Sequence, residues 1–247
     1  MNRPLFLLLL LFVSTLALAQ AACEFCKGGL EVTTIRYRDG QPHPVCSKCR
    51  TTLPACALCD NPSPGKAYRD GRHICPVCRK VGMFDKGRVA ALATQVVAFM
   101  QQQLGPEAKS LPPIQLVDLD EMQTKFNESG RSVDVVAFYR PYNPEMVYLL
   151  SGETEIESGS HLAHELTHAY ESRACPQQDR ALTEGFACWV QYHYLLSKGA
   201  TAEAERITRH QDPDYGPSLV KLLKRSQSLG RDKFLQAVKK ARKVEDV

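Results

Sequence analysis

The chain of 247 residues lacks a strong excess of charge, since 31 basic residues stand against 27 acidic ones and the formal net charge is only +4. Proteins that bind nucleic acid or acidic partners usually carry a larger basic excess, gathered on one face. The composition therefore argues against nucleic-acid binding. Four basic residues near the C-terminus are interpreted as a solvated helix face: Lys239, Lys240, Arg242 and Lys243.

Long apolar runs are also scarce. Residues 5–17 are almost wholly apolar, but this stretch is too short to be a comfortable membrane anchor, and no other run is long enough to span a bilayer. A short basic start with Arg3 precedes it, and the small residues Ala17-Leu18-Ala19 follow, as at a signal-peptide cleavage site. We therefore expect residues 1–19 to be a signal peptide, with export of the mature chain to the periplasm or beyond the cell and no stable membrane anchor after cleavage.

No internal repeat is evident except one short unit, C-x-x-C, which occurs four times. Each unit can present two thiolates to one metal ion, and two units complete a tetrahedron. We therefore predict two closed, structural zinc sites, the first made by Cys23, Cys26, Cys46 and Cys49, and the second by Cys56, Cys59, Cys75 and Cys78.

Disulfides are the alternative for these cysteines, because an exported chain enters an oxidising compartment. Identical C-x-x-C spacings are more typical of metal sites, so zinc is the preferred interpretation. His43 is a further candidate ligand, although a loop role explains it more simply. Cys175 and Cys188 stand apart from the four units. A disulfide between them is a hypothesis, with buried free thiols as the alternative.

The periodicity of apolar residues indicates two parts. Residues 23–80 are punctuated by Gly, Pro and Asp and lack a long apolar period, which predicts a LIM-like double zinc module of hairpins and turns. Helical spacing begins near residue 88, so a boundary is expected at 80–87. Residues 85–247 are expected to form a mostly helical domain with helices at 88–104, 160–173, 181–196, 217–228 and 231–243.

Three short β-prone runs within this second part predict a small sheet, at 114–119, 133–139 and 146–150. The run at 146–150 is interpreted as an edge strand above a cleft, where an extended peptide could add as a further strand. The predicted fold class is therefore α+β, with a small zinc module followed by a mostly helical domain.

The stretch His164-Glu165-Leu166-Thr167-His168 is an instance of H-E-x-x-H. On a helix, residues four apart share a face, so His164 and His168 can bind one zinc ion. Glu165 can then act as general base on a zinc-activated water that attacks a peptide bond. Glu184, on the next predicted helix, is the candidate third ligand, which leaves one position open. A surface role for Glu184 is the alternative.

Tyr215 and His210 are candidates for the donor that stabilises the developing oxyanion. The partners that orient the zinc-binding histidines stay open at this stage. Such histidines usually donate their second ring N–H to a carboxylate or carbonyl. Many zinc peptidases of this type place an Asp shortly after the third ligand, but here those positions hold Ala187 and Cys188.

The run GSHLAHELTHA at 159–169 resembles the G-S-x-L-A-H-E-x-x-H-A motif of the plant LIM-domain peptidases that restrict organ growth and are activated by ubiquitin, and of their bacterial relatives. Glu184-Gly185 follows at the family's distance, and Tyr215-Gly216 resembles its later Y-G motif. The resemblance implies a gluzincin-type metallopeptidase with one catalytic zinc on His164, His168 and Glu184, Glu165 as base, and two structural zinc ions in a LIM-like module.

The chain also departs from that family. No ubiquitin-binding helix pattern is found before the zinc module, and six residues separate Cys49 from Cys56 where a LIM domain has two. The signal peptide would remove the protein from the cytosol, so a role for ubiquitin is not expected. The sequence therefore predicts an exported zinc endopeptidase that acts on protein or peptide substrates. The alternative is a non-catalytic scaffold or adhesion protein. A further hypothesis is that the zinc module covers the cleft until it is displaced.

Overall fold

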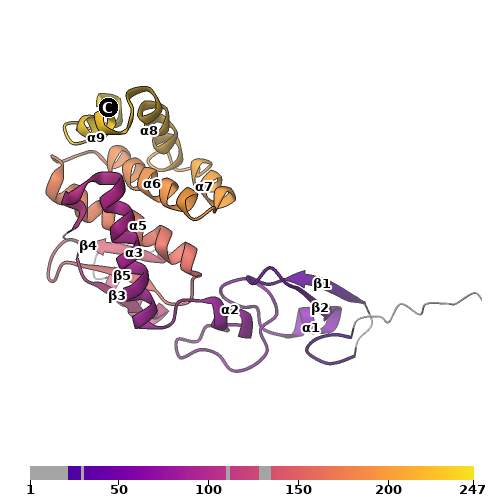
Figure 1. Cartoon of the computed structure of the whole chain (residues 1–247). Coiled ribbons are helices and arrows are strands. Elements are labelled where there is room, and N and C mark those ends of the chain that lie inside the picture. Colours follow the sequence, from indigo (N-terminus) through magenta and orange to yellow (C-terminus); the bar gives the residue numbers. More distant parts are fainter. Residues whose placement is uncertain (1–21, 29–30, 110–111, 128–134) are drawn as a thin grey trace, which may run out of the picture.

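The computed structural model describes residues 22–28, 31–109, 112–127 and 135–247. The predicted signal peptide, residues 1–19, lies outside these ranges. None of the helices in the described ranges is long and apolar enough to cross a membrane. As predicted, the fold is mixed α+β. A cysteine module (residues 22–81) extends from one end of a larger helical domain (residues 86–247) (Figure 1).

The cysteine module contains little regular structure. An antiparallel hairpin of β1 (Val32–Arg36) and β2 (Pro42–Cys46) leads into the short helix α1 (Ser47–Thr52), and α2 (Pro76–Val81) ends the module. Each helix begins at the first cysteine of a C-x-x-C unit. The backbone N–H of the second cysteine, Cys49 or Cys78, donates to the sulfur of the first. This turn holds the two sulfurs of each unit close together.

The helical domain contains a small sheet followed by a series of helices. Its first elements are α3 (Lys86–Leu104), η1 (Pro106–Lys109), β3 (Ile114–Val117), α4 (Leu119–Asn127), β4 (Ala137–Arg140) and β5 (Met146–Leu150). The helices that follow are α5 (Glu155–Ala174), α6 (Arg180–Ser197), α7 (Thr201–Thr208), α8 (Gly216–Leu229), α9 (Arg231–Val238) and the short η2 (Val244–Asp246).

The strands of this sheet have the order β3-β5-β4, with β3 parallel and β4 antiparallel to β5. The prediction that 146–150 is an edge strand is therefore wrong, because β5 lies in the middle and β4 lies at an edge of the described sheet. The burial of β5 gives the reason. Val147 and Leu149 belong to the main core, while Tyr148 and Leu150 pack in a second apolar cluster with α4 residues. A strand covered on both faces reads as a continuous apolar run.

Helix α5 begins at Glu155, earlier than the predicted start at residue 160. Thr154 caps it through a capping box, in which the Thr154 hydroxyl accepts from the N–H of Glu157 and the Glu157 carboxylate accepts from the N–H of Thr154. The first turn of α5 is mostly polar, so the apolar periodicity of the sequence does not indicate it. The longer helix places the H-E-x-x-H motif in its middle turns.

Helices α5 and α6 pack against each other, and α8 covers α6. Two glycines permit this approach. A Cβ at Gly159 of α5 would lie 2.1 Å from the hydroxyl of Tyr194 on α6, and a Cβ at Gly185 of α6 would lie 2.8 Å from the Cβ of Ser218 on α8. Since a larger residue at either position would push the helices apart, the glycines set the spacing of the helices that carry the candidate site.

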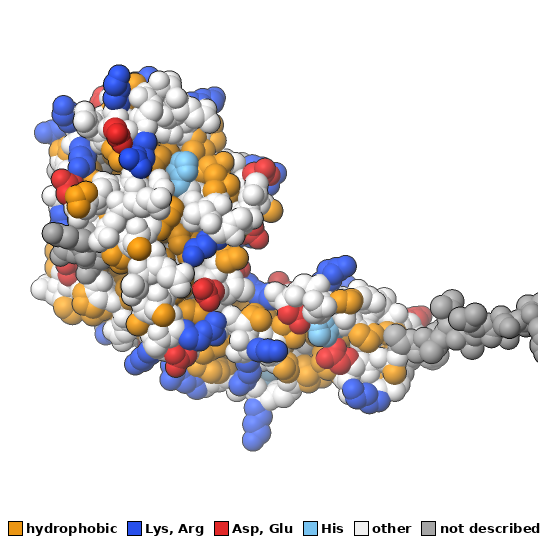
Figure 2. All heavy atoms as spheres, in the orientation of Figure 1, with side chains coloured by type: hydrophobic (Ala, Val, Ile, Leu, Met, Phe, Trp, Pro, Cys, Tyr) orange, Lys and Arg blue, Asp and Glu red, His pale blue; other side chains and the backbone are white. Residues whose placement is uncertain are grey.

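Basic and acidic side chains are interspersed over the face shown in Figure 2, in both the cysteine module and the helical domain. This distribution agrees with the formal net charge of only +4.

The two parts meet at the loop between β5 and α5. The N–H of Met83 donates to the carbonyl of Glu153 at 2.8 Å, and the N–H of Gly152 donates to the carbonyl of Met83 at 2.9 Å. Arg72 of the module, paired with Asp70 at 2.7 Å, donates to the carbonyl of Ser151 at 3.0 Å. The end of the module is thus bonded directly to the segment that starts α5.

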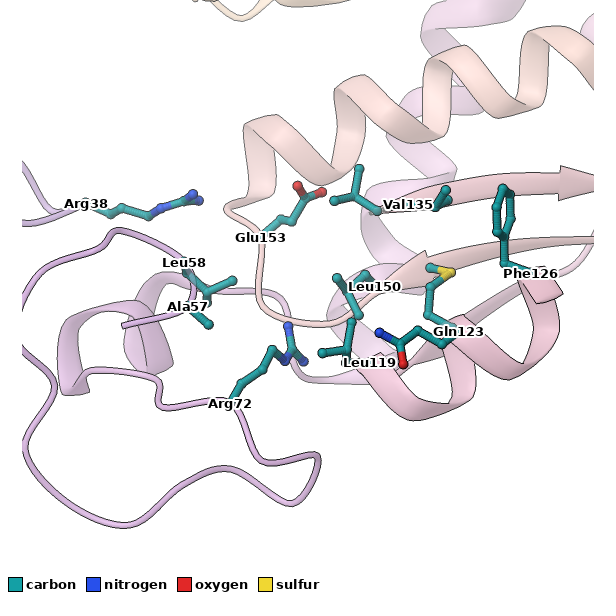
Figure 3. Close-up of a pocket in the computed structure, with 12 residues that line it drawn as sticks. Arg38, Ala57, Leu58, Arg72, Leu119, Gln123, Phe126, Val135, Leu150 and Glu153 are labelled. Carbon is teal, nitrogen blue, oxygen red and sulfur yellow. The ribbon is translucent and has the colours of Figure 1, made fainter. Parts of the chain in front are cut away.

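A cavity of about 340 Å³ lies beside this junction (Figure 3). Leu58 and Arg72 line it from the module, and Phe126 lies at its other end. Its walls are mostly apolar, and the charge of Arg72 is already paired with Asp70. None of the residues of the predicted zinc peptidase site lines the cavity, so it is a feature of the junction and not of that site.

Candidate metal centres and active site

The eight cysteines of the C-x-x-C units gather in the two predicted clusters of four, and in each cluster the ligand atoms lie within 4.8 Å of one another. The sulfur atoms of Cys26 and Cys46 are 3.7 Å apart, and those of Cys59 and Cys75 are 3.9 Å apart. A tetrahedral ion with sulfur ligands at about 2.3 Å would separate them by about 3.8 Å. Both clusters therefore have dimensions that could hold a metal ion.

The thiols of each cluster differ in acidity. Burial alone would raise the pKa of Cys23, but surrounding backbone N–H groups lower it to about 6. In the second cluster a hydrogen bond with Cys78 lowers the pKa of Cys59 to about 5, whereas burial raises that of Cys75 to about 11. In each cluster, Cys23 in the first and Cys59 in the second, a thiol has a pKa low enough for ionisation near neutral pH. Metal binding would displace the remaining protons.

All ten cysteines are free, so the disulfide alternative for the C-x-x-C units is not found. The hypothesis of a disulfide between Cys175 and Cys188 is also wrong. Cys188 lies within α6, and its sulfur is 3.9 Å from Nδ1 of His164. His43 does not join a cysteine cluster, because its Nδ1 pairs with Glu24 at 2.6 Å.

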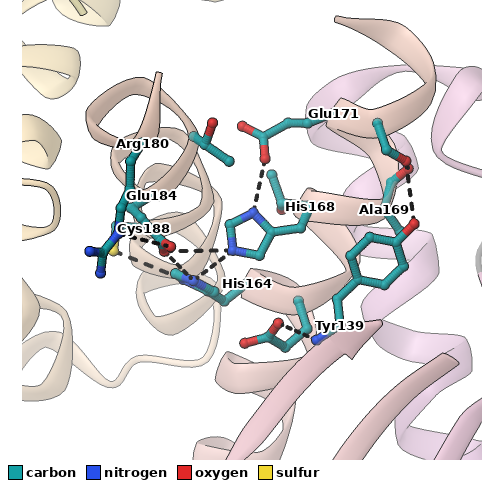
Figure 4. Close-up of polar contacts among 12 residues, drawn as sticks. Tyr139, His164, His168, Ala169, Glu171, Arg180, Glu184 and Cys188 are labelled. Atoms are coloured by element: carbon teal, nitrogen blue, oxygen red, sulfur yellow. Dashed lines mark hydrogen bonds and ion pairs between the residues drawn. The ribbon is translucent and has the colours of Figure 1, made fainter. Parts of the chain in front are cut away.

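His164, His168 and Glu184 converge as the sequence predicts, from α5 and α6 (Figure 4). The Nε2 atoms of the two histidines are 3.2 Å apart, and Oε2 of Glu184 lies 3.3 Å and 3.6 Å from them. A tetrahedral zinc ion with nitrogen and oxygen ligands at about 2.1 Å would separate its ligands by about 3.4 Å. The donor types and their spacing therefore fit a zinc ion.

Glu184 is held in its ionised form. Burial alone would raise its pKa, but hydrogen bonds to His164 and His168 hold it well below its ordinary value. Arg180, one turn earlier on α6, lies 4.0 Å from the other carboxylate oxygen and 3.5 Å from Asp214. Glu184 thus offers a negatively charged oxygen beside the two imidazoles, as a metal ligand must.

Glu165 lies beside this cluster and contacts the edge of the sheet. Its Oε2 accepts a hydrogen bond of 2.7 Å from the backbone N–H of Tyr139 on β4. The carbonyl of Val136 accepts from the N–H of Leu150 on β5. Because successive residues of a strand direct their backbone groups to opposite sides, the backbone groups of Ala137 and Tyr139 face away from β5. The strand edge therefore borders the candidate base.

The partner of His168 was missed at the sequence level. Its Nδ1 lies 3.0 Å from Oε2 of Glu171, which is one turn further along α5 and buried. The position one turn after Glu184 on α6 holds Cys188. A signal was present, because the spacing of three residues on a helix places Glu171 beside His168.

Tyr215, the predicted oxyanion donor, also lies at the cluster. Its ring is nearly parallel to that of His164, with the centroids 6.2 Å apart. Burial, and next the charge of Glu184, raise the pKa of Tyr215 to about 12, so the hydroxyl is protonated at neutral pH. Gly216 allows the turn here, since a Cβ would lie 2.3 Å from the carbonyl of His210. His210 itself is exposed, with its ring 5.2 Å from that of Tyr215.

The cysteine module does not reach this site through any contact of the described residues. Its polar contacts with the helical domain lie at Ser151, Glu157, Asp118 and Leu119. The hypothesis that the module covers the cleft therefore has no support in these contacts.

Comparisons with protein-family models, with curated proteins and with solved structures found no match to this chain. The functional conclusion therefore depends on the geometry of the site.

Proposed function

We propose that this protein is a zinc-dependent endopeptidase with His164, His168 and Glu184 as zinc ligands and Glu165 as general base. The proposal rests mainly on one observation. Two imidazoles and a carboxylate lie at ligand spacing, and Glu165, whose carboxylate is fixed by the N–H of Tyr139, follows His164 directly. A carboxylate in this place is needed for chemistry and not for metal binding.

The chemistry follows from the neighbouring residues. Zinc, when bound, supplies a Lewis acid that polarises the scissile carbonyl and makes water more acidic. Glu165 takes a proton from the attacking water and later gives one to the leaving amine. Tyr215, protonated at neutral pH, donates a hydrogen bond to the oxygen on which negative charge develops.

The class of substrate is inferred from the side of strand β4 that faces away from β5. Its outward-facing backbone groups at Ala137 and Tyr139 can pair with an extended peptide, which would add as a further strand. The N–H of Tyr139 bonds to Glu165 in the free protein, so the candidate base lies at the edge where the peptide would bind. Such recognition depends on the peptide backbone and favours unfolded segments of proteins.

The remaining predictions belong to the same proposal. The two cysteine clusters would hold structural zinc ions in a LIM-like module, the helical domain would have the gluzincin arrangement, and the mature protein would be exported after cleavage of residues 1–19. The resemblance of the motifs to the LIM-domain peptidases supports this combination. Ubiquitin has no part in it.

The test compares the mature chain with Glu165→Gln. Zinc content and hydrolysis of an unfolded protein such as casein are measured for both. We expect three zinc ions per chain in each protein, and hydrolysis by the unsubstituted chain alone, because Gln cannot accept the proton. Equal hydrolysis by both would contradict the mechanism. Three zinc ions with no hydrolysis by either protein would favour the scaffold alternative.

A further inference from the structure

Glu171 is a buried carboxylate for which the proposed mechanism has no role. It lies on α5, only 6% exposed, and its side chain points toward His168 (Figure 4). Its Oε2 lies 3.0 Å from Nδ1 of His168. Its Oε1 is buried with no hydrogen-bond partner among the residues that the structure describes.

This environment is unfavourable for a residue that only fills space. A buried carboxylate loses its hydration, and the loss is offset only by strong hydrogen bonds or charge pairs. Here one oxygen has no described partner, and the recorded polar partner of the other is His168. Burying Glu171 is therefore explained best by its interaction with that imidazole.

The two candidate zinc-binding histidines are supported unequally. The neighbour of His164 Nδ1 is the sulfur of Cys188 at 3.9 Å, and a thiol is a weak hydrogen-bond acceptor. His168 Nδ1 instead faces a carboxylate, the strongest acceptor among the side chains when it is ionised. The second ring nitrogen of a metal-binding histidine is the atom through which a protein fixes the ring.

We propose that Glu171 is the positioning residue of the candidate metal site. It accepts a hydrogen bond from Nδ1–H of His168, which fixes the tautomer with a free Nε2 and directs that nitrogen toward Glu184 and His164. It also makes the imidazole a stronger donor to a cation. This inference rests on the proposed metal site formed by His164, His168 and Glu184, but it does not require that the site hydrolyse peptides.

The experiment measures zinc affinity of the mature chain. Zinc per chain is followed across a series of chelator concentrations, in which the open site should lose its ion before the four-cysteine sites do. The His164→Ala variant should lack the open site, so the step of zinc release that is missing from its titration is the one that belongs to this site. We expect Glu171→Ala to weaken zinc binding in this step by about 10- to 100-fold. Glu171→Gln, which keeps an acceptor but loses the charge, should fall between the two, and Cys188→Ser should remain close to the unsubstituted chain.

A second measurement separates positioning from a structural role. Thermal unfolding is compared with the open site loaded and with it empty, while the cysteine clusters stay filled. Positioning predicts that Glu171→Ala lowers the melting temperature more with the open site loaded than with it empty, because the additional loss acts through metal affinity. An equal loss in both states, or unchanged zinc affinity in Glu171→Ala, overturns the inference.

These outcomes are distinct from those of the peptidase proposal. A protein that hydrolyses casein, but whose Glu171→Ala variant binds zinc as tightly, would refute the role of Glu171 and leave the peptidase intact. If the protein showed no hydrolysis but its Glu171→Ala variant released zinc more readily, the peptidase proposal would be refuted and the role of Glu171 would stand.

Discussion

Tyr215 lies where its position and its protonation state both suit a donor to a developing negative charge. Its ring is parallel to that of His164, and its raised pKa of about 12 keeps the hydroxyl protonated through neutral and mildly alkaline pH. Burial is the main cause of this raised pKa, and the charge of Glu184, which adds to it, would be partly neutralised by a bound cation.

Replacing Tyr215 by Phe removes the hydroxyl and keeps the ring beside His164. We expect kcat to fall by about 10²- to 10³-fold, as for other lost oxyanion donors, with zinc content unchanged. Steady-state hydrolysis of a peptide and metal analysis measure the two quantities. Tyr68→Phe, a matched change within the cysteine module, is the control and should leave kcat unaltered. A normal kcat in Tyr215→Phe would assign the donor role to another group.

At the scale of elements, the two cysteine clusters are placed differently with respect to the helical domain. Cys75 caps the N-terminus of α2 and Cys78 lies within it, and α2 is followed directly by Gly82 and Met83, which pair with the segment before α5. The first cluster lies at the hairpin of β1 and β2, further from the helical domain (Figure 1). A metal ion in the second cluster would therefore support the start of the helix that carries the H-E-x-x-H motif.

Cys56→Ser and Cys23→Ser test this difference. Each variant should lose one zinc ion per chain, because a cluster of three thiols binds the ion less well. Only Cys56→Ser should also lower hydrolysis and the melting temperature of the helical domain, since it loosens the segment that joins α2 to α5. Metal analysis, calorimetry and a peptide assay provide the three measurements. Equal effects of both substitutions on the helical domain would contradict the argument.

The parts of the fold that the sequence predicts are those in which the spacing of neighbouring residues is enough to indicate the element. The apolar period of 88–104 and the two-helix arrangement around H-E-x-x-H and Glu184 correspond to α3, α5 and α6. The four C-x-x-C units likewise indicated which cysteines gather. Helix α4 was not predicted, because its first apolar residue, Leu119, was assigned to the β-prone run 114–119, and Met122 and Phe126 alone do not establish a period.

The parts of the site that were missed depend on long-range structure. The contact of Glu165 with β4 uses a backbone N–H, which no residue type reveals. Strand order also lies beyond local patterns, so the sequence does not reveal that β5 is the central strand. Glu171 is a different case, because it lies on the helix of the histidines, whereas the Asp expected from other zinc peptidases would follow the third ligand on α6. The rest of the candidate site follows from residue types and their spacing.

At the scale of the whole molecule, a buried ion pair joins the module to the helical domain. The side chains of Arg72 and Asp70 are 7% and 0% exposed. Beyond their mutual contact, Arg72 donates to Ser151, and Asp70 accepts from the N–H of Leu119 at 3.0 Å. Burial would raise the pKa of Asp70, but the hydrogen bond from Arg72 and that N–H lower it. The pair therefore connects three segments at once.

Asp70→Asn leaves Arg72 buried without its counter-charge. We expect a loss of about 3–5 kcal/mol in the free energy of unfolding, as for other broken buried pairs, measured by urea denaturation of the zinc-loaded protein. Because the folded pKa of Asp70 is lowered, its contribution is complete above the unfolded value of about 3.9 and is lost only as pH falls through the folded value. The difference should therefore be constant from about pH 6 to 8.

The control for this variant is Arg69→Gln, which removes an exposed pair across the same junction. Arg69 is 63% exposed and lies 3.0 Å from Asp118. An exposed pair contributes at most about 1 kcal/mol. If Asp70→Asn were no more destabilising than this change, the buried pair would not be what holds the two parts together.

The outward-facing backbone of β4 has a consequence for the solubility of the protein. A strand edge that accepts an extended peptide can equally accept the same edge of a second copy, which is a route to aggregation. The strand limits this hazard by its short span, Ala137–Arg140, and by the carboxylate of Glu165, which occupies the N–H of Tyr139 in the resting state. The candidate catalytic base would thus also protect this edge until a peptide displaces it.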